Sequence, residues 1–239
     1  MVQGGQILKQ VINKLQPNLI PGKTTEEIDQ EARSLIHKYG GQTSFDRVEG
    51  YQWATCLSVN EIVVHGVPNN TSLKKGDLLK LDVGVFNKGY HIDFSDTYLI
   101  DEKEKGKVKR FLDCGRQTLQ KIIKLSQAGT HLGLISQTIN QEISQAGYQV
   151  ILDLTGHTIG RKLHMDPLIP QFLQETIEKT PCFKIGQAYA LEVIYSFKDA
   201  RVNHANDDGW SLKTKHNSLS ACFENTIFIE PKQTLILVN

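Results

Sequence analysis

The sequence predicts an α+β protein, and two observations carry that prediction. Two helical segments come first, strand-like segments then run to residue 100, two more helices follow, and strands return after residue 150. Residues 21–40 and 128–147 also resemble each other when one segment is laid over the other. The coinciding pairs are Gly22/Gly129, Ile28/Ile135, Gln30/Gln137, Ile36/Ile143 and Gly40/Gly147. Shared helix patterns alone can give such a match. A true duplication would instead give two similar helix-plus-sheet halves with a cleft between them.

The first two predicted helices precede residue 41. Apolar residues at helical spacing and the intervening lysines predict an amphipathic helix that ends near Leu15, unlike the apolar core of a signal peptide. A second helix begins after Thr24, because Thr24 and Glu27 have the spacing of a capping box. It ends at Gly40.

Two further helices and a return to strands complete the prediction. Apolar stripes predict helices over 103–126 and 131–146, and Gly147 ends the second of them. The runs "AYALEVIYSF" (188–197) and "SACFENTIFI" (220–229) read as strands. A short helix is predicted near 167–178.

Composition indicates a globular chain with no special partner. The 27 basic and 26 acidic residues nearly cancel, so neither nucleic acid nor membrane is indicated as a partner. The four cysteines form no CxxC pair, which argues against a disulfide framework or a thiolate zinc site and favours the cytoplasm. No Pro/Gly/Ser-rich linker divides the sequence, so we expect a single domain over residues 1–239.

Two aspartates stand in an apolar hairpin, "LKLDVGVFNKGYHIDFSD" (79–96). Asp82 and Asp93 lie on either side of the turn residues 87–89, which are midway between them. Whether the loop is 87–88 or 88–89, the two carboxylates share one face of the hairpin, either opposite or diagonal, and can share one cation. Asp96 has the opposite parity and is expected to face away.

Glu192 and Glu224 occupy similar positions in the later strands. An ionised side chain among apolar neighbours needs a paired charge or a metal, although each glutamate taken singly also fits a rim position. The nearest cationic candidates are His65, His157 and His164. Carboxylates plus imidazole without thiolate suit Mn, Fe, Co or Zn, and several carboxylates suit two ions better than one.

This pattern resembles the type I methionine aminopeptidases of the pita-bread metallopeptidase family, over nearly the whole chain. The resemblance implies a pita-bread fold, in which two pseudo-symmetric halves form a central antiparallel sheet backed by helices. The metal ligands it implies are Asp82, Asp93, His157, Glu192 and Glu224.

The same resemblance implies a reaction, the removal of N-terminal methionine by a hydroxide bridging two divalent metal ions. Asp93 and Glu224 would bridge the ions. Glu192 would relay a proton, His164 would stabilise the oxyanion, and His65 would orient the scissile amide.

A methionine pocket is implied at Tyr51, Cys56, Leu163 and Trp210, together with His65. Tyr51 and Trp210 also fit the role of ordinary core aromatics. The sequence departs from the family pattern at Thr158, where glycine is usual, at Leu163, where an aromatic residue is usual, at Met165, where an acid is common, and at Val193, where proline is usual. Thr158 and Met165 are expected to narrow the cleft.

The resemblance further implies peptide or nascent-chain N-termini as substrates, visits to the ribosome and a monomeric enzyme. Two rival functions remain open. A related peptidase that cuts before proline would share all five ligands, and a non-catalytic pita-bread binding protein would have lost the chemistry. Such binding proteins usually have broken ligand sets, whereas this sequence has all five.

Overall fold

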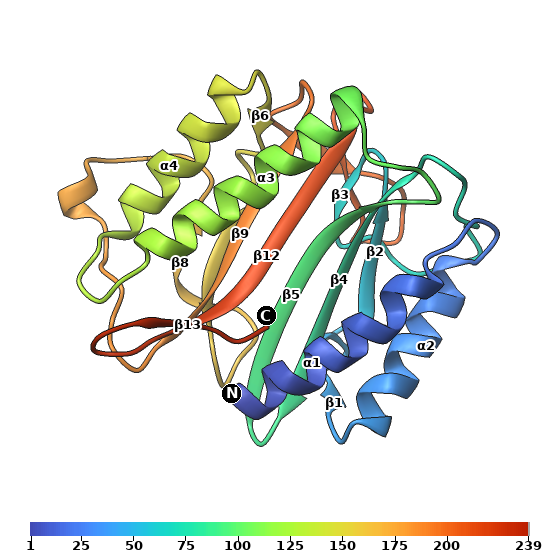
Figure 1. Ribbon diagram of the computed structural model, residues 1–239, viewed down its shortest axis with the longest axis horizontal. Coiled ribbons are helices and arrows are strands. Elements are labelled where there is room, and N and C mark those ends of the chain that lie inside the picture. Colours follow the sequence, from blue (N-terminus) through green and yellow to red (C-terminus); the bar gives the residue numbers. More distant parts are fainter. Residues whose placement is uncertain (239) are drawn as a thin grey trace.

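A sheet of ten strands forms the centre of the protein, and every neighbouring pair in it is antiparallel (Figure 1). The computed structural model describes residues 1–238. Its main path runs β1-β4-β5-β12-β9-β7-β8, while β2 pairs with β4, β6 with β9 and β13 with β12. These ten strands are β1 (Gln42–Thr43), β2 (Thr55–Val59), β4 (Leu78–Asn87), β5 (Tyr90–Leu99), β6 (Gln149–Val150), β7 (Thr155–Ile159), β8 (Met165–Pro170), β9 (Ala188–Ser196), β12 (Ser220–Ile229) and β13 (Thr234–Ile236).

A small second sheet has the order β10-β11-β3. Its strands are β3 (Ile62–Val64), β10 (Val202–His204) and β11 (Leu212–Thr214). Three short 3₁₀ turns lie at Gln16–Asn18, Phe45–Arg47 and Ile177–Lys179.

The four longer predicted helices are present: α1 (Val2–Leu15), α2 (Thr25–Lys38), α3 (Gly106–Leu125) and α4 (Leu132–Gln145). The predicted capping box begins α2, because the Glu27 carboxylate accepts from the Thr24 N–H at 2.7 Å and the Thr24 hydroxyl accepts from the Glu27 N–H at 3.2 Å. No helix within residues 1–238 has both the length and the apolar character needed to cross a membrane.

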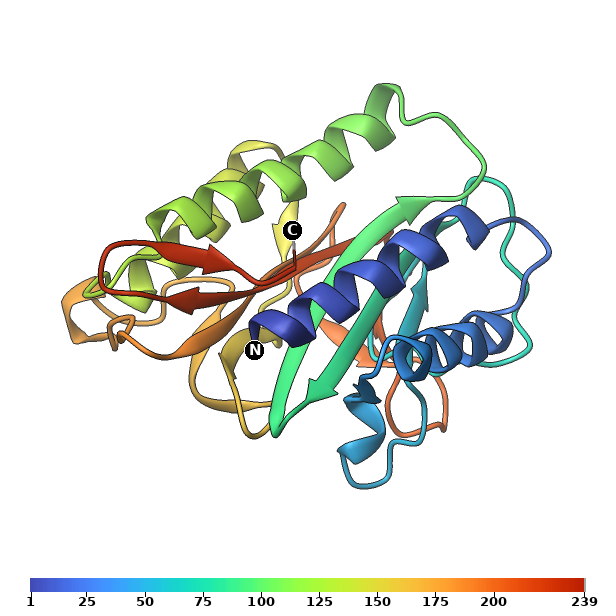
Figure 2. The same cartoon turned by 60° about the horizontal axis from the view of Figure 1, so that its bottom comes forward.

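The helices pack on one face of the large sheet (Figure 2). Helix α1 covers β4 and β5, with α2 beside it near β1 and β2. Helix α3 covers β9 and β12, with α4 beside it near β6 and β8. Gly115 brings α3 close to the sheet, since a Cβ at this position would lie 2.4 Å from Cδ2 of Phe223. Every second residue of a strand enters this helix-covered core, as Leu81 of β4 and Val193 of β9 do. The next residue along each strand faces the other side of the sheet.

The short helix predicted near 167–178 is wrong. Residues 165–170 form β8, which pairs with β7, and helical geometry appears only in the 3₁₀ turn Ile177–Lys179. Pro167 and Pro170 explain the difference, because a proline disfavours the helical conformation of the residue before it and lacks the N–H that a helix interior needs.

Candidate metal centre

Five neighbouring strands each contribute one predicted ligand to the face away from the helices. In sheet order, β4, β5, β12, β9 and β7 contribute Asp82, Asp93, Glu224, Glu192 and His157. All five are buried or nearly so, although they come from segments as far apart as residues 82 and 224. The sheet order therefore brings the complete predicted ligand set into one row.

The hairpin of β4 and β5 places its two aspartates as the sequence predicted. Its loop is Lys88-Gly89, and both residues have positive φ, 50° and 86°. A two-residue loop with this backbone matches the twist of the two strands. Asp82 pairs directly with Ser95, which is the next residue after Asp93 on the same face of β5, so the two carboxylates lie diagonally on that face.

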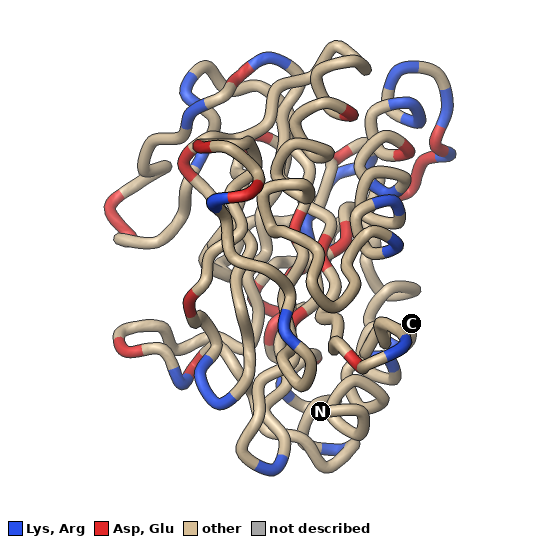
Figure 3. Tube along the Cα trace, turned by 90° about the vertical axis from the view of Figure 1, so that its left-hand side faces the viewer, with Lys and Arg blue, Asp and Glu red and all other residues tan. Residues whose placement is uncertain are grey.

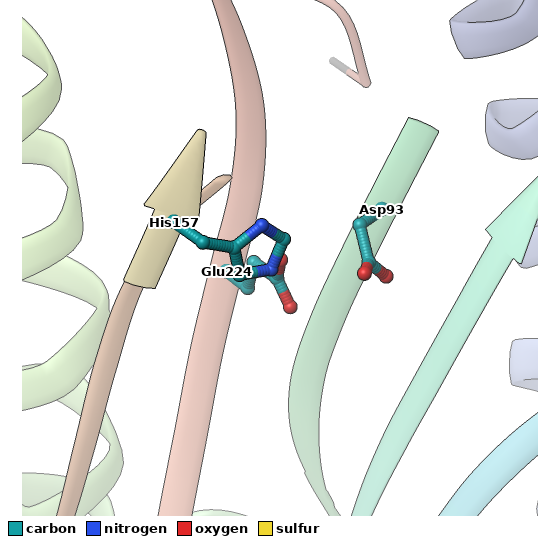
Figure 4. A group of neighbouring side chains, drawn as sticks. All are labelled: Asp93, His157 and Glu224. Atoms are coloured by element: carbon teal, nitrogen blue, oxygen red, sulfur yellow. The ribbon is translucent and has the colours of Figure 1, made fainter. Parts of the chain in front are cut away.

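The other predicted ligands converge on the same space. Glu192 and Glu224 are paired directly across β9 and β12. Ligand atoms of Asp93, His157 and Glu224 all lie within 4.8 Å of one another, and the three side chains point into one space between their strands (Figure 4). Nε2 of His157 lies 3.5 Å from Oε1 of Glu192. The four carboxylates would repel one another if all were ionised, so the arrangement calls for a neutralising cation.

Hydrogen bonding fixes the tautomer of His157. Its Nδ1 lies 3.1 Å from the carbonyl oxygen of Thr158, and since a carbonyl only accepts, Nδ1 carries the proton. Burial lowers the pKa of His157 to about 3, so the ring is neutral at neutral pH. The Nε2 lone pair therefore faces the carboxylates, as metal ligation by histidine requires.

The buried carboxylates have oxygen atoms that no protein group satisfies. Oδ1 of Asp82 and Oε1 of Glu224 have no hydrogen-bond partner anywhere in residues 1–238. Burial, reinforced by neighbouring carboxylates, raises the pKa of Asp82, Glu192 and Glu224 well above their usual range, and burial raises that of Asp93 to about 7. Four carboxylates and one imidazole with unsatisfied oxygens fit divalent cations of the Mn, Fe, Co and Zn group.

Asp96 faces away from this centre, as predicted. It points to the helix-covered side, where Arg116 of α3 lies 3.9 Å away. Figure 3 shows acidic positions in the middle of the trace as well as on its outer loops. Because side chains alternate along β5, Asp96 lies near an arginine on one face and Asp93 lies at the proposed metal centre on the other.

Two threonines that the sequence analysis missed join the strands at the centre. The Thr226 hydroxyl accepts from the Asp93 N–H at 2.9 Å and donates to the Asp93 carbonyl at 2.8 Å. The Thr97 hydroxyl accepts from the Cys222 N–H at 3.0 Å and donates to the Cys222 carbonyl at 2.8 Å. These side chains take the place of backbone hydrogen bonds between β5 and β12. Both threonines lie an even number of residues from Asp93 or Glu224 on the same strand, so the sequence could have placed them on the same face.

A cavity of about 80 Å³ opens beside Asp82 and Asp93. All the predicted pocket residues line it, and Phe45 and Val48, which the sequence analysis missed, line it as well. Its remaining lining residues are Tyr51, Cys56, His65, Leu163, His164 and Trp210. The Tyr51 hydroxyl donates to the Thr55 carbonyl at 2.8 Å, and its ring meets that of Trp210 edge-on at 5.1 Å. The two aromatics therefore both pack together and face the cavity.

His65 and His164 lie between this cavity and a second one of about 230 Å³, which His157 and Glu192 also line. The rings of His157 and His164 are 4.5 Å apart. Burial, with a smaller effect of His164, lowers the pKa of His65 to about 4, and burial lowers the pKa of His164. Neutral imidazoles each keep one N–H for donation to a bound molecule.

The departures from the family pattern lie mostly outside the two cavities. Thr158 and Met165 line neither of them, so the narrowing expected there is not seen. The Thr158 hydroxyl instead donates to the Pro167 carbonyl at 3.0 Å. Val193 is buried on the helix-covered face, where its side chain cannot reach the ligands. Only Leu163 among the four lines a site cavity.

Comparison with known proteins gives a consistent result. A sequence model of metallopeptidase family M24 matches residues 1–231. A methionine aminopeptidase of Clostridium perfringens is 34% identical over 237 residues, which are 99% of this chain and 94% of the relative. The crystal structure of the Thermotoga maritima methionine aminopeptidase has a TM-score of 0.94 at 33% identity, covering 100% of this chain and 95% of that one. A prolidase from Pyrococcus furiosus shares the fold with a TM-score of 0.77 at 16% identity, covering 100% of this chain and 62% of the prolidase.

Proposed function

The chain belongs to metallopeptidase family M24, and we propose that it is a type I methionine aminopeptidase that hydrolyses the N-terminal methionine of peptides and nascent proteins. The pita-bread fold expected from the sequence is confirmed by its structural neighbours. The observation that carries the proposal is the row of five ligands on consecutive strands beside a mainly apolar cavity. We also propose that residues 1–239 form one catalytic domain, since strands from both halves share one sheet.

Two divalent ions, of Mn, Co, Fe or Zn, are proposed to bind the five ligands. Asp93 and Glu224 occupy neighbouring strands in the middle of the row and have ligand residues on both sides, so both would help to hold the ions. When bound, such ions polarise a carbonyl oxygen and lower the pKa of water, which makes a nucleophile available near neutral pH.

The protein's own groups then have separate tasks. Glu192 is buried with a raised pKa, and its carboxylate is proposed to take up and pass on a proton. His164 and His65 lie between the two cavities, where their N–H groups can donate to the developing oxyanion and to the scissile amide.

The mainly apolar cavity is proposed to hold the methionine side chain. Tyr51, Cys56, Leu163 and Trp210 would contact an unbranched thioether there, since such a side chain packs well among apolar and aromatic groups. The second cavity, across the two histidines, is then the place for the residues that follow.

We further propose a monomeric enzyme that acts in the cytoplasm on chains emerging from the ribosome. All four cysteines are free in the part of the chain that the structure describes, which supports a reducing compartment. Nothing in the arrangement of the site requires a second subunit, because all five ligands come from one chain.

A two-substrate assay tests the proposal. Met-Ala-Ser and Ala-Pro-Ala are offered to protein treated with EDTA and then supplied separately with Mn, Co, Fe or Zn. We expect cleavage of Met-Ala-Ser only, abolished by EDTA and restored by at least one metal. Cleavage of Ala-Pro-Ala alone would identify an Xaa-Pro peptidase, and inactivity with every metal would point to a non-catalytic protein.

A further inference from the structure

The outer edge of β9 is incomplete beside Glu192. Strand β6 pairs with β9 at Tyr195 and Ser196, and β7 pairs with it at positions 188–190. Neither strand pairs with residues 191–194. Buried backbone groups need partners, so the groups that point outward from this stretch must bond elsewhere.

The Ile151 N–H donates to the Ile194 carbonyl at 3.0 Å, and one side chain, that of Gln171, bonds two further groups in the gap. Its Nε2 donates to the Glu192 carbonyl at 3.2 Å, and its Oε1 accepts from the Ile194 N–H at 3.0 Å. The amide orientation follows from chemistry, because a carbonyl can only accept and an N–H can only donate. Gln171 is fully buried and follows directly after β8.

This contact acts at a residue of the proposed metal centre. The Glu192 carboxylate lies 3.5 Å from Nε2 of His157 and belongs to a residue paired directly with Glu224. Two hydrogen bonds tie the backbone on either side of Val193 to the segment that follows β8, where neither β6 nor β7 pairs with β9. They fix the backbone from which the Glu192 carboxylate projects.

We infer that Gln171 is a positioning residue, whose side-chain amide holds Glu192 in place for metal binding and for proton transfer in the reaction. It does not touch the substrate or the metal. The inference rests on the proposed function for its catalytic part, while its metal-binding part stands separately. Mutation of a group that orients a metal ligand typically lowers metal affinity or activity by about 10- to 100-fold.

Gln171→Met tests this role, because methionine has similar length and no hydrogen-bonding amide. Ser196→Ala is the matched control. Ser196 is also fully buried on β9, but its hydroxyl bonds the backbone of Lys198 and Asp199 instead of a ligand strand. Both variants lose buried hydrogen bonds and are expected to lose some stability.

The full-length proteins are compared by calorimetric titration with Mn²⁺ and by steady-state cleavage of Met-Ala-Ser. For Gln171→Met we expect kcat and Mn²⁺ affinity to fall about 10- to 100-fold with KM nearly unchanged. Ser196→Ala is expected to keep both values. Wild-type kcat and affinity in Gln171→Met, or equal losses in Ser196→Ala, would overturn the inference.

Two further arms keep the result decisive. If Gln171→Met does not fold, Gln171→Asn replaces it. Asparagine keeps the amide, but its shorter side chain reaches only one of the two backbone groups, so a smaller loss in the same direction is expected. If the wild type cleaves no peptide, the proposed function fails, and the Mn²⁺ affinities of the variants alone decide for or against Gln171.

Discussion

The two halves of the protein follow the same plan. Helix α4 begins at Leu132 and α2 at Thr25, the positions that coincide when segment 128–147 is laid over segment 21–40, and both helices have 14 residues. Strands β1 and β6 follow at coinciding positions, and both pair with the ligand strand of their own half. Asp82 and Glu192 each take the fifth position of their strands, β4 and β9. The structure supports a true duplication over a chance match of helix patterns.

The halves differ in the strand beside the ligand strand. In the N-terminal half, β2 places Cys56 opposite Asp82, next to the apolar cavity. In the C-terminal half, the strand in this place is β7, which carries His157. The shared scaffold thus supplies paired carboxylates, while the differing strands supply one residue of the pocket wall in one half and the imidazole in the other.

Loss of a carboxylate should be equally severe in either half, and this is the largest effect we expect. Asp82→Asn and Glu192→Gln each remove one ligand from equivalent strands. Each should lower cleavage of Met-Ala-Ser by more than about a thousandfold. Loss of a metal ligand should reduce the rate more than loss of a group that orients a ligand or of an oxyanion donor. Steady-state assays and Mn²⁺ titrations measure the effect. Asp96→Asn, on the other face of β5, is the control and should keep activity.

The second prediction separates the halves, because the proposed oxyanion donor comes from the C-terminal one. His164→Ala should lower kcat by about 100- to 1000-fold, the usual effect of removing one such donor. Mn²⁺ affinity should stay the same, because His164 is not among the five ligands. Wild-type turnover in a folded His164→Ala protein would contradict the role.

Much of this site could be predicted from local pattern, and the rest could not. Strand parity placed Asp82 and Asp93 on one face and Asp96 on the other, because side chains alternate in any strand. The gathering of His157 with Glu224 depends on sheet order, which no local pattern contains, and only the resemblance to a family indicated it. Contacts made across the sheet by single side chains, such as those of Thr226 and Gln171, were missed for the same reason.

The third prediction concerns the charge that both halves bring together without metal. Between pH 7.5 and 9 the buried histidines are neutral in the folded protein and almost entirely neutral in the unfolded one, because their usual pKa is about 6.5. The carboxylates have raised pKa values in the folded state, Asp93 about 7, so the folded protein binds more protons than the unfolded one. Stability must therefore fall as pH rises through this window. Burial lowers the pKa of Lys80 to about 7, so this group alone makes stability rise with pH. It is one group, whereas several carboxylates have the opposite effect.

Thermal unfolding in EDTA measures this effect. We expect Tm to fall by roughly 5 °C or more from pH 7.5 to 9, given about 1.4 kcal/mol per pKa unit and a few degrees per kcal/mol. Mn²⁺ should remove the fall, because the cation neutralises the carboxylates. Asp82→Asn and Glu192→Gln should each flatten the slope. A Tm that rises with pH in EDTA would show that the carboxylates do not dominate.

The smallest expected effect belongs to the pocket, at Tyr51, which the N-terminal half contributes. Tyr51→Phe removes the hydroxyl that donates to the Thr55 carbonyl at 2.8 Å and lies 3.2 Å from Cys56 Sγ. The loss should destabilise the protein by about 1 kcal/mol and raise KM for Met-Ala-Ser about two- to fivefold through a looser cavity wall. Since the ligands and His164 are untouched, kcat and Mn²⁺ affinity should not change. Tyr148→Phe, in the C-terminal half, changes a tyrosine that packs on Phe111 away from both cavities. It should leave KM unchanged, and an equal rise in both variants would mean that Tyr51 acts through general packing and not through the pocket.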